Sequence, residues 1–379
     1  MLYRTMSRAE DKLSILGFGC MRFPTIDGDK IDEKKAIKML HYAIDNGVNY
    51  IDTAYPYHNG YSELLVAKAL KDGYREKVKL ATKLPSWLIQ TRADMDKYLN
   101  EQLKRLETDY IDYYLLHALN KTDWKKLKQL GVLEFLDISL KSGKIRYAGF
   151  SFHDDIELFK EVVDSYEWTF CQIQYNYLDE EYQAGKEGLK YAAKKGIGVI
   201  VMEPLRGGKL TNNIPKEVEK IWNKSDIKRT PAEWALQWIW NHPEVTIVLS
   251  GMSNMHQVKE NICLASSQYA HENSLKDEEI ELVNEVKAIY KSKIKINCTN
   301  CRYCMPCPNG VNIPECFNEY NNLSIFGDFK SSKASYNALL KEEERASKCI
   351  SCGKCEVACP QNIPIIEKLM EIAKVFEKS

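Results

Sequence analysis

The pattern that most restricts this fold is an alternation of short apolar runs with amphipathic helical stretches, from about Ser14 to Ser266. Strands alternating with helices form parallel βαβ units, and eight such units predict a closed (β/α)8 TIM barrel, an α/β fold. An open doubly wound sheet is the alternative, but no GxGxxG turn follows the first run. The predicted strands are Ile15–Gly19, Tyr50–Asp52, Val78–Lys83, Ile111–His117, Ile145–Phe150, Phe170–Gln174, Gly198–Met202 and Thr246–Leu249.

The intervening helices carry their own start and stop signals. Asp32 is a candidate N-cap for the stretch DEKKAIKMLHYAIDNG, and Gly47 is a candidate stop. The stretch PAEWALQWIWNH opens with a proline, which suits the first helical turn. The segment from Leu2 to Arg8 precedes the first strand, and we expect it to begin a hairpin that plugs the barrel floor.

Charge and hydropathy exclude two classes of partner. Lysine plus arginine equals aspartate plus glutamate at 53 each, so the chain lacks the basic excess that nucleic acid binding requires. The opening residues MLYRTMSRAEDKLS mix charges, and no later segment is long and apolar enough for a membrane span. We therefore expect a cytoplasmic protein with no nucleic acid and no membrane partner.

The cysteines are concentrated near one end of the chain. Nine of the 12 cysteines lie from Cys298 onward. In a reducing compartment such a cluster binds metal more often than it forms disulfides. We therefore predict a barrel over residues 1–270, a charged helical connector over residues 271–293, and a cysteine-rich domain over residues 294–379.

The spacing of these cysteines favours iron–sulfur clusters. The run CISCGKCEVACP has the C-x2-C-x2-C-x3-C-P spacing of bacterial ferredoxins, and CTNCRYCMPCP is a shortened version of it. In ferredoxins the last cysteine of each run binds the other cluster. The predicted ligand sets are Cys298, Cys301, Cys304 and Cys359 for one 4Fe-4S cluster, and Cys349, Cys352, Cys355 and Cys307 for the other.

Zinc is the alternative for these cysteines, but structural zinc sites prefer two separated C-x2-C pairs. Each run is followed by an echo, NGVNIP and QNIP, which indicates an internally duplicated, mostly α-helical ferredoxin-like domain. Four other cysteines, Cys316, Cys20, Cys171 and Cys263, are interpreted as small buried apolar residues rather than ligands.

Four polar residues stand at or just after the predicted ends of the second, third and fourth strands. They are Asp52, Tyr57, Lys83 and His117. Active sites of such barrels lie at the C-terminal ends of the strands. Together these side chains provide the parts of a proton-donating site: a phenol, an ammonium that lowers the phenol's pKa, a carboxylate that holds the ammonium, and an imidazole that orients a carbonyl oxygen.

These strand ends, DTA-x2-Y, TK and LLH, resemble those of the aldo-keto reductase family of NAD(P)-dependent carbonyl reductases, over roughly Leu13 to Ser267. With the two cysteine runs, the whole chain resembles the subgroup with a C-terminal ferredoxin-like domain. The resemblance implies that Tyr57 is the proton donor, supported by Asp52, Lys83 and His117.

The resemblance also implies a nucleotide site, with some departures from the family pattern. Phe152 replaces the asparagine that usually follows Ser151, and Met202 occupies the place of the usual stacking aromatic. The basic residues that usually hold a ribose 2′-phosphate are replaced by Gly251 and Gln257, so the cofactor can equally be NADPH, NADH or a nonstandard redox ligand. The implied cofactor-binding residues are Gly19, Met21, Ser151, Gln172, Pro204, Leu205, Arg206, Gly207, Gly251, Gln257 and Asn261.

The combined expectation is an iron–sulfur oxidoreductase of aldo-keto reductase type. It reduces a small-molecule carbonyl, or oxidises an alcohol, while two 4Fe-4S clusters relay electrons to or from a partner protein. A hydride carries two electrons and each cluster one, and no flavin signature is legible, so another cofactor or the partner has to bridge the two. The alternatives are a redox-sensing or regulatory barrel without carbonyl turnover and a zinc-stapled structural adaptor.

Overall fold

The computed structural model describes the chain except for residues 27–29, 213, 299–301, 360 and 378–379. The chain divides into two compact units. The first comprises Met1–Thr211 and Arg229–Ile280, and the second comprises Asn212–Lys228 and Glu281–Ser379. In the described part of the chain, no helix combines the length and the apolar character needed to cross a bilayer.

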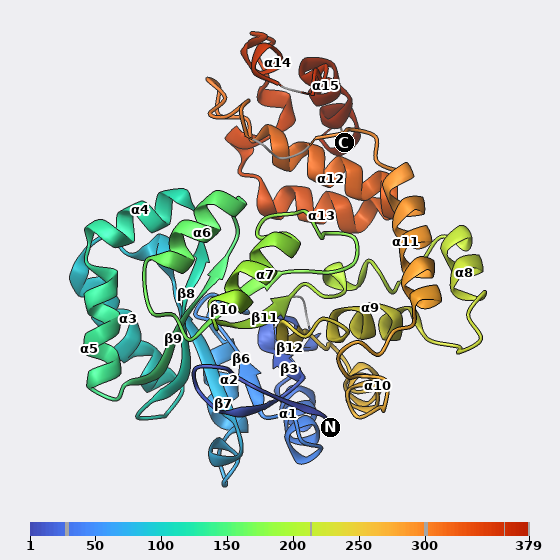
Figure 1. The fold of residues 1–379 in the computed structure, drawn as a ribbon. Coiled ribbons are helices and arrows are strands. Elements are labelled where there is room, and N and C mark those ends of the chain that lie inside the picture. The colour runs from blue at the N-terminus through green and yellow to red at the C-terminus, as the bar shows by residue number, and fades with distance from the viewer. Residues whose placement is uncertain (27–29, 213, 299–301, 360, 378–379) are drawn as a thin grey trace. The chain divides into compact units, whose positions relative to one another are not determined.

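The first unit is a closed barrel of parallel strands with helices around it (Figure 1). The order around the barrel is β3, β6, β7, β8, β9, β10, β11, β12 and back to β3. The predicted barrel is therefore confirmed, and the open-sheet alternative is wrong. The strands are β3 (Leu16–Gly19), β6 (Tyr50–Asp52), β7 (Lys79–Leu84), β8 (Ile111–Leu119), β9 (Ile145–Phe152), β10 (Phe170–Gln174), β11 (Gly198–Met202) and β12 (Val245–Ser250).

The barrel helices begin and end where the local sequence favours it. The Asp32 side chain accepts a hydrogen bond from the Lys35 backbone N–H at the start of α1, and Gly47 follows that helix with a φ of 94°. The helices are α1 (Glu33–Asp45), α2 (Ser62–Ala69), α3 (Arg92–Arg105), α4 (Lys121–Gln129), α5 (Val132–Lys141), α6 (Ile156–Asp164), α7 (Gly185–Lys194), α9 (Pro231–Trp240) and α10 (Met255–Ala265). Short 3-10 turns are η1 (Cys20–Arg22), η2 (Arg75–Lys77), η3 (Ser86–Leu88) and η4 (Arg206–Gly208).

A hairpin lies before the first barrel strand, as predicted. Its strands β1 (Tyr3–Thr5) and β2 (Lys12–Ser14) pair antiparallel. Met6, in the turn between them, is fully buried in one apolar cluster with Tyr50, Tyr113 and Phe170, which come from the barrel strands. The hairpin therefore supplies part of the core at the start of the strands. A second pair of short antiparallel strands is formed by β4 (Thr25–Ile26) and β5 (Lys30–Ile31).

The second unit is helical, and its core is built around a repeated element. Helix α12 begins at the end of the first echo and α15 directly after the second, and the two helices contact each other. Their apolar faces share one core with Tyr336 and the cysteine runs. The elements are α8 (Lys216–Trp222), residues 281–292 of α11 (Asp277–Ser292), α12 (Ile313–Phe326), α13 (Phe329–Leu339), η5 (Glu342–Glu344), η6 (Ala346–Lys348), α14 (Lys354–Ala358) and α15 (Ile365–Phe376).

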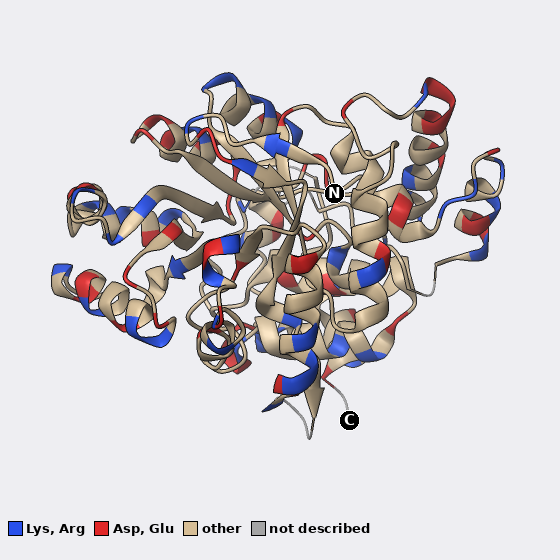
Figure 2. Ribbon diagram, turned by 90° about the horizontal axis from the view of Figure 1, so that it is seen from below, with Lys and Arg blue, Asp and Glu red and all other residues tan. Residues whose placement is uncertain are grey.

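Basic and acidic residues are mixed along the helices that the structure describes. Figure 2 shows lysine and arginine interspersed with aspartate and glutamate along the helices. This distribution matches the equal numbers of basic and acidic residues in the sequence.

Candidate active site and cysteine-lined cavity

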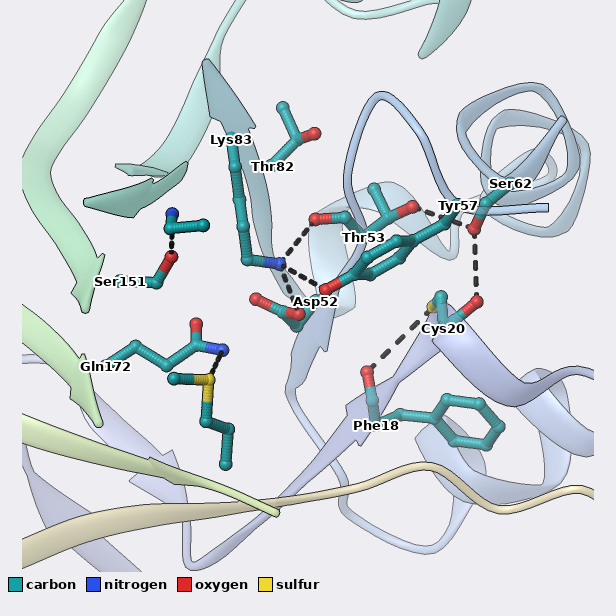
Figure 3. Close-up of polar contacts among 12 residues, drawn as sticks. Phe18, Cys20, Asp52, Thr53, Tyr57, Ser62, Thr82, Lys83, Ser151 and Gln172 are labelled. Carbon is teal, nitrogen blue, oxygen red and sulfur yellow. Dashed lines mark hydrogen bonds and ion pairs between the residues drawn. The ribbon is translucent and has the colours of Figure 1, made fainter. Parts of the chain in front are cut away.

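The candidate active site lies at the C-terminal ends of neighbouring barrel strands. Asp52 ends β6, Lys83 lies one residue before the end of β7, and Tyr57 follows β6 in a loop. Lys83 Nζ donates to Asp52 Oδ1 at 2.6 Å and to the Thr53 carbonyl oxygen at 2.8 Å. It also lies 3.4 Å from the Tyr57 hydroxyl (Figure 3). Since Lys83 is fully buried, one ammonium joins the carboxylate and the phenol away from solvent.

His117 lies next to the phenol. Its ring is edge-on to that of Tyr57, with the centroids 6.0 Å apart, and its centroid is 5.1 Å from that of Trp87. Its Nδ1 is buried and has no hydrogen-bond partner among the described residues. The structure thus brings together all four side chains proposed from the sequence. An imidazole nitrogen without a protein partner in this place is free to bond to a ligand.

Burial dominates the proton affinities at this site. Burial raises the pKa of the Tyr57 phenol, and this outweighs the Lys83 ammonium, which lowers it. The net lowering expected from the sequence is therefore wrong, because the ring is enclosed as well as paired. Burial is the largest single effect on the pKa of Lys83 and lowers it, but the charges and hydrogen bonds of Asp52 and Tyr57 together outweigh it, so the pKa is raised and the ammonium stays charged. Burial, and then the charge of Lys83, hold the pKa of His117 well below its ordinary value, so this imidazole is neutral.

A break in the strand ladder shapes the end of β8. The pairing of β8 with β9 shifts register between Leu116 and Leu119. In this break Ala118 adopts a left-handed conformation with a φ of 53°, which a non-glycine residue rarely takes. The Ala118 backbone N–H donates to Ser151 Oγ at 2.7 Å. The bulge therefore sets the direction of the chain at His117, and it leaves the Ser151 hydroxyl proton for another acceptor.

Gln172 faces the same space from the neighbouring strand β10 (Figure 3). Its Nε2 lies 3.5 Å from the Met202 sulfur, and its Oε1 is buried without a hydrogen-bond partner in the described part of the chain. Gln172 Oε1 can accept a hydrogen bond from the NH2 group of a carboxamide, and the Ser151 hydroxyl can donate one to the carboxamide oxygen. The residues present therefore fit the amide of a nicotinamide ring.

The second unit contains a small cavity lined by cysteines from both runs. Cys298 and Cys304 come from the first run and Cys359 from the last position of the second. Its other lining residues are Arg302, Ile313, Pro314, Phe317, Gln361, Ile363 and Ile365. A cavity with thiols and mostly apolar walls fits a thiolate-bound cluster. Cys301, the fourth proposed ligand, lies outside the described residues.

The remaining proposed ligands lie in the same core. Cys355 is buried there, and Cys307 and Cys349 pack against it. The Asn309 side chain donates to the Lys348 carbonyl oxygen at 2.5 Å, which ties the end of the first run to the start of the second. Cys352 is exposed. Within the described residues, no three or more His, Cys, Asp or Glu side chains are gathered closely enough to hold a metal ion.

The cysteines outside the two runs differ in burial. Cys20, Cys171 and Cys316 are fully buried, as expected for small apolar residues. Burial raises the pKa of Cys316 to about 12, so its thiol is protonated. Cys263 is exposed on α10, and its predicted burial is wrong because it lies on the outward face of that helix.

Comparison with known proteins agrees with both parts of this geometry. Residues 15–288 match the Aldo/keto reductase family. The chain belongs to the aldo/keto reductase family. Residues 297–363 match a 4Fe-4S dicluster domain, so the chain is an aldo/keto reductase-type oxidoreductase with an iron–sulfur domain.

The relatives share a low percentage of identical residues with this chain but align with most of its length. "Probable aldo-keto reductase 1" of Glycine max is 27% identical over 285 residues, which are 66% of this chain and 80% of that protein. "Uncharacterized oxidoreductase YrpG" of Bacillus subtilis is 28% identical, over 76% of this chain and 96% of that protein. The holo form of aldo-keto reductase AKR11C1 from Bacillus halodurans has a TM-score of 0.64 and 28% identity, over 76% of this chain and 96% of its own.

The aldo/keto reductase positions proposed for a pyrophosphate lie in the turn after β11. Gly207 has a φ of 66°, which the turn requires. Arg206 Nε donates to Asp179 Oδ2 at 2.9 Å, so this guanidinium is already held by a carboxylate. Pro204 and Leu205 form the turn that precedes η4. Arg22, which the sequence did not suggest, forms an ion pair with Glu203 in the same loop at 3.3 Å.

The other positions carried over from the family lie on adjacent loops. Asn261 Nδ2 donates to Ser250 Oγ at 3.0 Å, and Gln257 Oε1 accepts from the Ser253 backbone. The stem of Arg22 passes over Gly251, since a side-chain carbon added there would lie 3.1 Å from Arg22 Cδ. Gly19 ends β3, and Met21 is exposed in η1.

Two functional neighbours escaped the sequence reasoning. Trp87 was missed because it lies on η3, beyond the strand end, although a tryptophan four residues after Lys83 is a visible signal. Thr53 contributes through its carbonyl oxygen, which any residue could supply, so no sequence signal exists for it.

Proposed function

We propose that the barrel reduces a small-molecule carbonyl, or oxidises the corresponding alcohol, with Tyr57 as the proton donor. The observation that carries this proposal is the contact of one buried ammonium, Lys83, with both Asp52 and the Tyr57 hydroxyl. A phenol is a weak acid, and a positive charge at hydrogen-bond distance stabilises the phenolate that remains after proton transfer. Asp52 keeps that positive charge in place.

The other side chains position the reacting oxygen. In the direction of reduction, a reduced nicotinamide supplies a hydride to the carbonyl carbon when it is bound. Tyr57 donates its proton to the carbonyl oxygen, so one carbonyl becomes one alcohol. His117 is neutral, and its imidazole N–H hydrogen-bonds to the same oxygen and fixes its direction. Gln172 Oε1 and the Ser151 hydroxyl are the groups that would hold the carboxamide.

One solved protein of similar fold and two positions of this chain bear on the choice of nucleotide. Among the solved aldo/keto reductases of similar fold, one from Klebsiella pneumoniae is described in complex with NADP and acetate, at 23% identity and a TM-score of 0.62. We propose NADH or NADPH as the cofactor of this chain. The replacement of basic residues by Gly251 and Gln257 argues against a fixed preference for the 2′-phosphate.

We further propose that the iron–sulfur domain binds two 4Fe-4S clusters that exchange electrons with a partner protein. The ligand sets are Cys298, Cys301, Cys304 and Cys359 for the first cluster and Cys349, Cys352, Cys355 and Cys307 for the second. The cavity that contains Cys298, Cys304 and Cys359 supports the exchange of the last cysteine between the runs. Each cluster, when assembled, supplies a one-electron store.

The first test is substitution of the proton donor. In Tyr57→Phe, prepared without oxygen, we expect the reduction of a test aldehyde such as nitrobenzaldehyde by NADH or NADPH to fall by about 10²-fold or more, since a general acid contributes that much. The affinity for nucleotide, measured by fluorescence titration, should change little, because the phenol does not hold the carboxamide.

The control for this variant is the visible absorbance of the clusters, which should equal that of the wild type. Full turnover in Tyr57→Phe would refute the assignment of the proton donor. A wild-type protein that binds nucleotide but shows no turnover with a panel of aldehydes and ketones would instead favour the regulatory barrel.

A further inference from the structure

A buried polar cluster lies behind the candidate active site, outside the barrel wall. Its centre is Glu63 on α2, a carboxylate with no exposed surface. Glu63 Oε1 accepts hydrogen bonds from Thr82 Oγ1 at 2.7 Å and from Gln102 Nε2 at 2.8 Å. Glu63 Oε2 forms an ion pair with Arg105 Nε at 2.9 Å. A buried carboxylate with three partners is costly to bury and strongly restrained by them.

The cluster is connected to the backbone of the lysine strand. Thr82 immediately precedes Lys83 on β7. Gln102 Nε2, besides its bond to Glu63, donates to the Lys83 carbonyl oxygen at 2.9 Å. Gln102 Oε1 accepts from the Tyr114 hydroxyl at 2.9 Å, which fixes the orientation of the amide. The Lys83 carbonyl oxygen and the side chain of the preceding Thr82 are therefore held from α2 and α3.

The same cluster reaches the loop that carries the phenol. Arg105 donates from Nη2 to the Gly60 carbonyl oxygen. Gly60 closes the turn after Tyr57, since its N–H donates to the Tyr57 carbonyl oxygen at 3.1 Å. The Arg105 guanidinium also lies over the ring of Tyr55, 4.7 Å from its centroid. One carboxylate thus links, through one arginine and one glutamine, the two segments that carry Tyr57 and Lys83.

We propose that Glu63, with Arg105 and Gln102, is a positioning residue that sets the distance between the Tyr57 hydroxyl and the Lys83 ammonium. This inference rests on the proposed role of Tyr57 as proton donor. The two atoms are 3.4 Å apart, at the long end of a hydrogen bond, so a small shift of either segment breaks their contact. Neither Glu63 nor its partners touch the reacting atoms.

The test compares Glu63→Gln with a matched control. Glu63→Gln keeps the size of the side chain and removes the charge that holds Arg105. The control is Asp112→Asn, which removes the charge of another buried carboxylate: Asp112 is paired with Arg75 at 2.7 Å and accepts from the Leu80 N–H. Leu80 lies near the start of β7, at the end of the strand away from Lys83. Both variants weaken a buried ion pair whose carboxylate also accepts a hydrogen bond from β7, but only the Glu63 pair lies beside the site.

We expect kcat for nitrobenzaldehyde reduction to fall roughly tenfold or more in Glu63→Gln, with the KM for nucleotide unchanged, because misplacement of about 1 Å costs this much. Reduction needs the protonated phenol. As the ammonium withdraws, the phenol becomes a weaker acid, so the alkaline limb of the kcat profile should move to higher pH. In Asp112→Asn, kcat and its pH profile should match those of the wild type.

A second measurement does not depend on turnover. Crystal structures of the two variants should show the Tyr57–Lys83 contact lengthened by roughly 1 Å in Glu63→Gln and unchanged in Asp112→Asn. An unchanged distance in Glu63→Gln, or a pH profile and kcat equal to those of the control, would overturn the inference. An inactive wild type in which the variant still lengthens the contact would refute the proposed reaction and leave the positioning role supported.

Discussion

His117 and Lys83 illustrate how neighbouring charges decide the net effect of burial on two bases, because burial alone lowers the pKa of both. Lys83 stays charged because a carboxylate is 2.6 Å away. His117 has no such carboxylate, and burial together with the charge of Lys83 keeps it neutral. The candidate active site therefore combines a charged ammonium, Lys83, with a neutral hydrogen-bond donor, His117. A site of this kind can stabilise a phenolate without adding a second positive charge beside the substrate.

The neutral state of His117 predicts a pH dependence of stability. Its pKa is lowered in the folded state, whereas the unfolded chain binds the proton below about pH 6.5. The unfolded state therefore gains protons first, and the contribution of His117 to stability, full above that pH, is lost as the pH falls. Between pH 8 and about pH 5.5, the melting temperature of the wild type should fall more than that of His117→Asn.

The control is His256→Asn, since His256 is exposed on α10 and should leave the pH dependence of the wild type unchanged. Equal slopes in the wild type and His117→Asn would show that His117 titrates normally.

At the scale of elements, helix α10 shows how a short polar side chain fixes the position of several others. The Asn254 side chain accepts from the Gln257 backbone N–H at 3.0 Å at the first turn of the helix. The same helix carries Gln257 and Asn261, both proposed nucleotide contacts. The loss of one cap therefore affects local stability and the orientation of the first turn together.

We expect Asn254→Ala to lower the free energy of unfolding by about 1 kcal/mol, the usual cost of a lost N-cap. Urea unfolding followed by circular dichroism measures this change. Asn254→Asp is the matched variant, because aspartate accepts the same hydrogen bond and should retain nearly full stability. An alanine variant as stable as the aspartate variant would mean that the cap contributes nothing.

The sequence predicted the elements well for a physical reason. Strands of a parallel barrel are buried on both faces, so each reads as a short apolar run between helical stretches. The ends were less predictable: β8 was expected to stop at His117 but continues to Leu119. The difference arises from the left-handed Ala118, whose conformation depends on a hydrogen bond to another strand. The residues around Ala118 give no indication of a hydrogen bond to a distant strand.

The candidate site was predictable in composition but not in its supports. Its four side chains could be chosen because the C-terminal ends of parallel strands lie together at one end of the barrel. They are Asp52, Tyr57, Lys83 and His117. The role of Glu63 could not be predicted, because its partners come from β7 and α3, and only the fold places them around one carboxylate. The net direction of the Tyr57 pKa shift also depended on enclosure, which no motif reports.

At the scale of the whole molecule, the chain consists of two compact units with separate cores. The barrel unit carries the proposed proton donor, and the helical unit carries the paired cysteine runs. In the helical unit, residues far apart in sequence line one cavity, since Cys298 and Cys304 lie there with Cys359. The two halves of this unit are therefore expected to share ligands rather than to act as independent repeats.

Shared ligands predict how the iron content responds to substitution. Cys304→Ser and Cys359→Ser should each lose about half of the iron, and the double variant should lose no more than either alone, because both residues serve one cluster. Cys355→Ser combined with Cys359→Ser should lose nearly all of it. Iron and acid-labile sulfide analysis under anaerobic conditions measures these amounts.

The control for this series is Cys263→Ser, which lies on the exposed face of α10 and should retain all the iron. If Cys304→Ser and Cys359→Ser proved additive, each run would bind its own cluster and the exchange between them would be refuted.

The place of Cys359 in this cavity also bears on how the protein is made. The wall beside Cys298 and Cys304 is incomplete until residue 359 has left the ribosome, by which time the whole barrel has already been synthesised. On the proposed ligand set, a cluster in that cavity can therefore be completed only after the barrel has been synthesised.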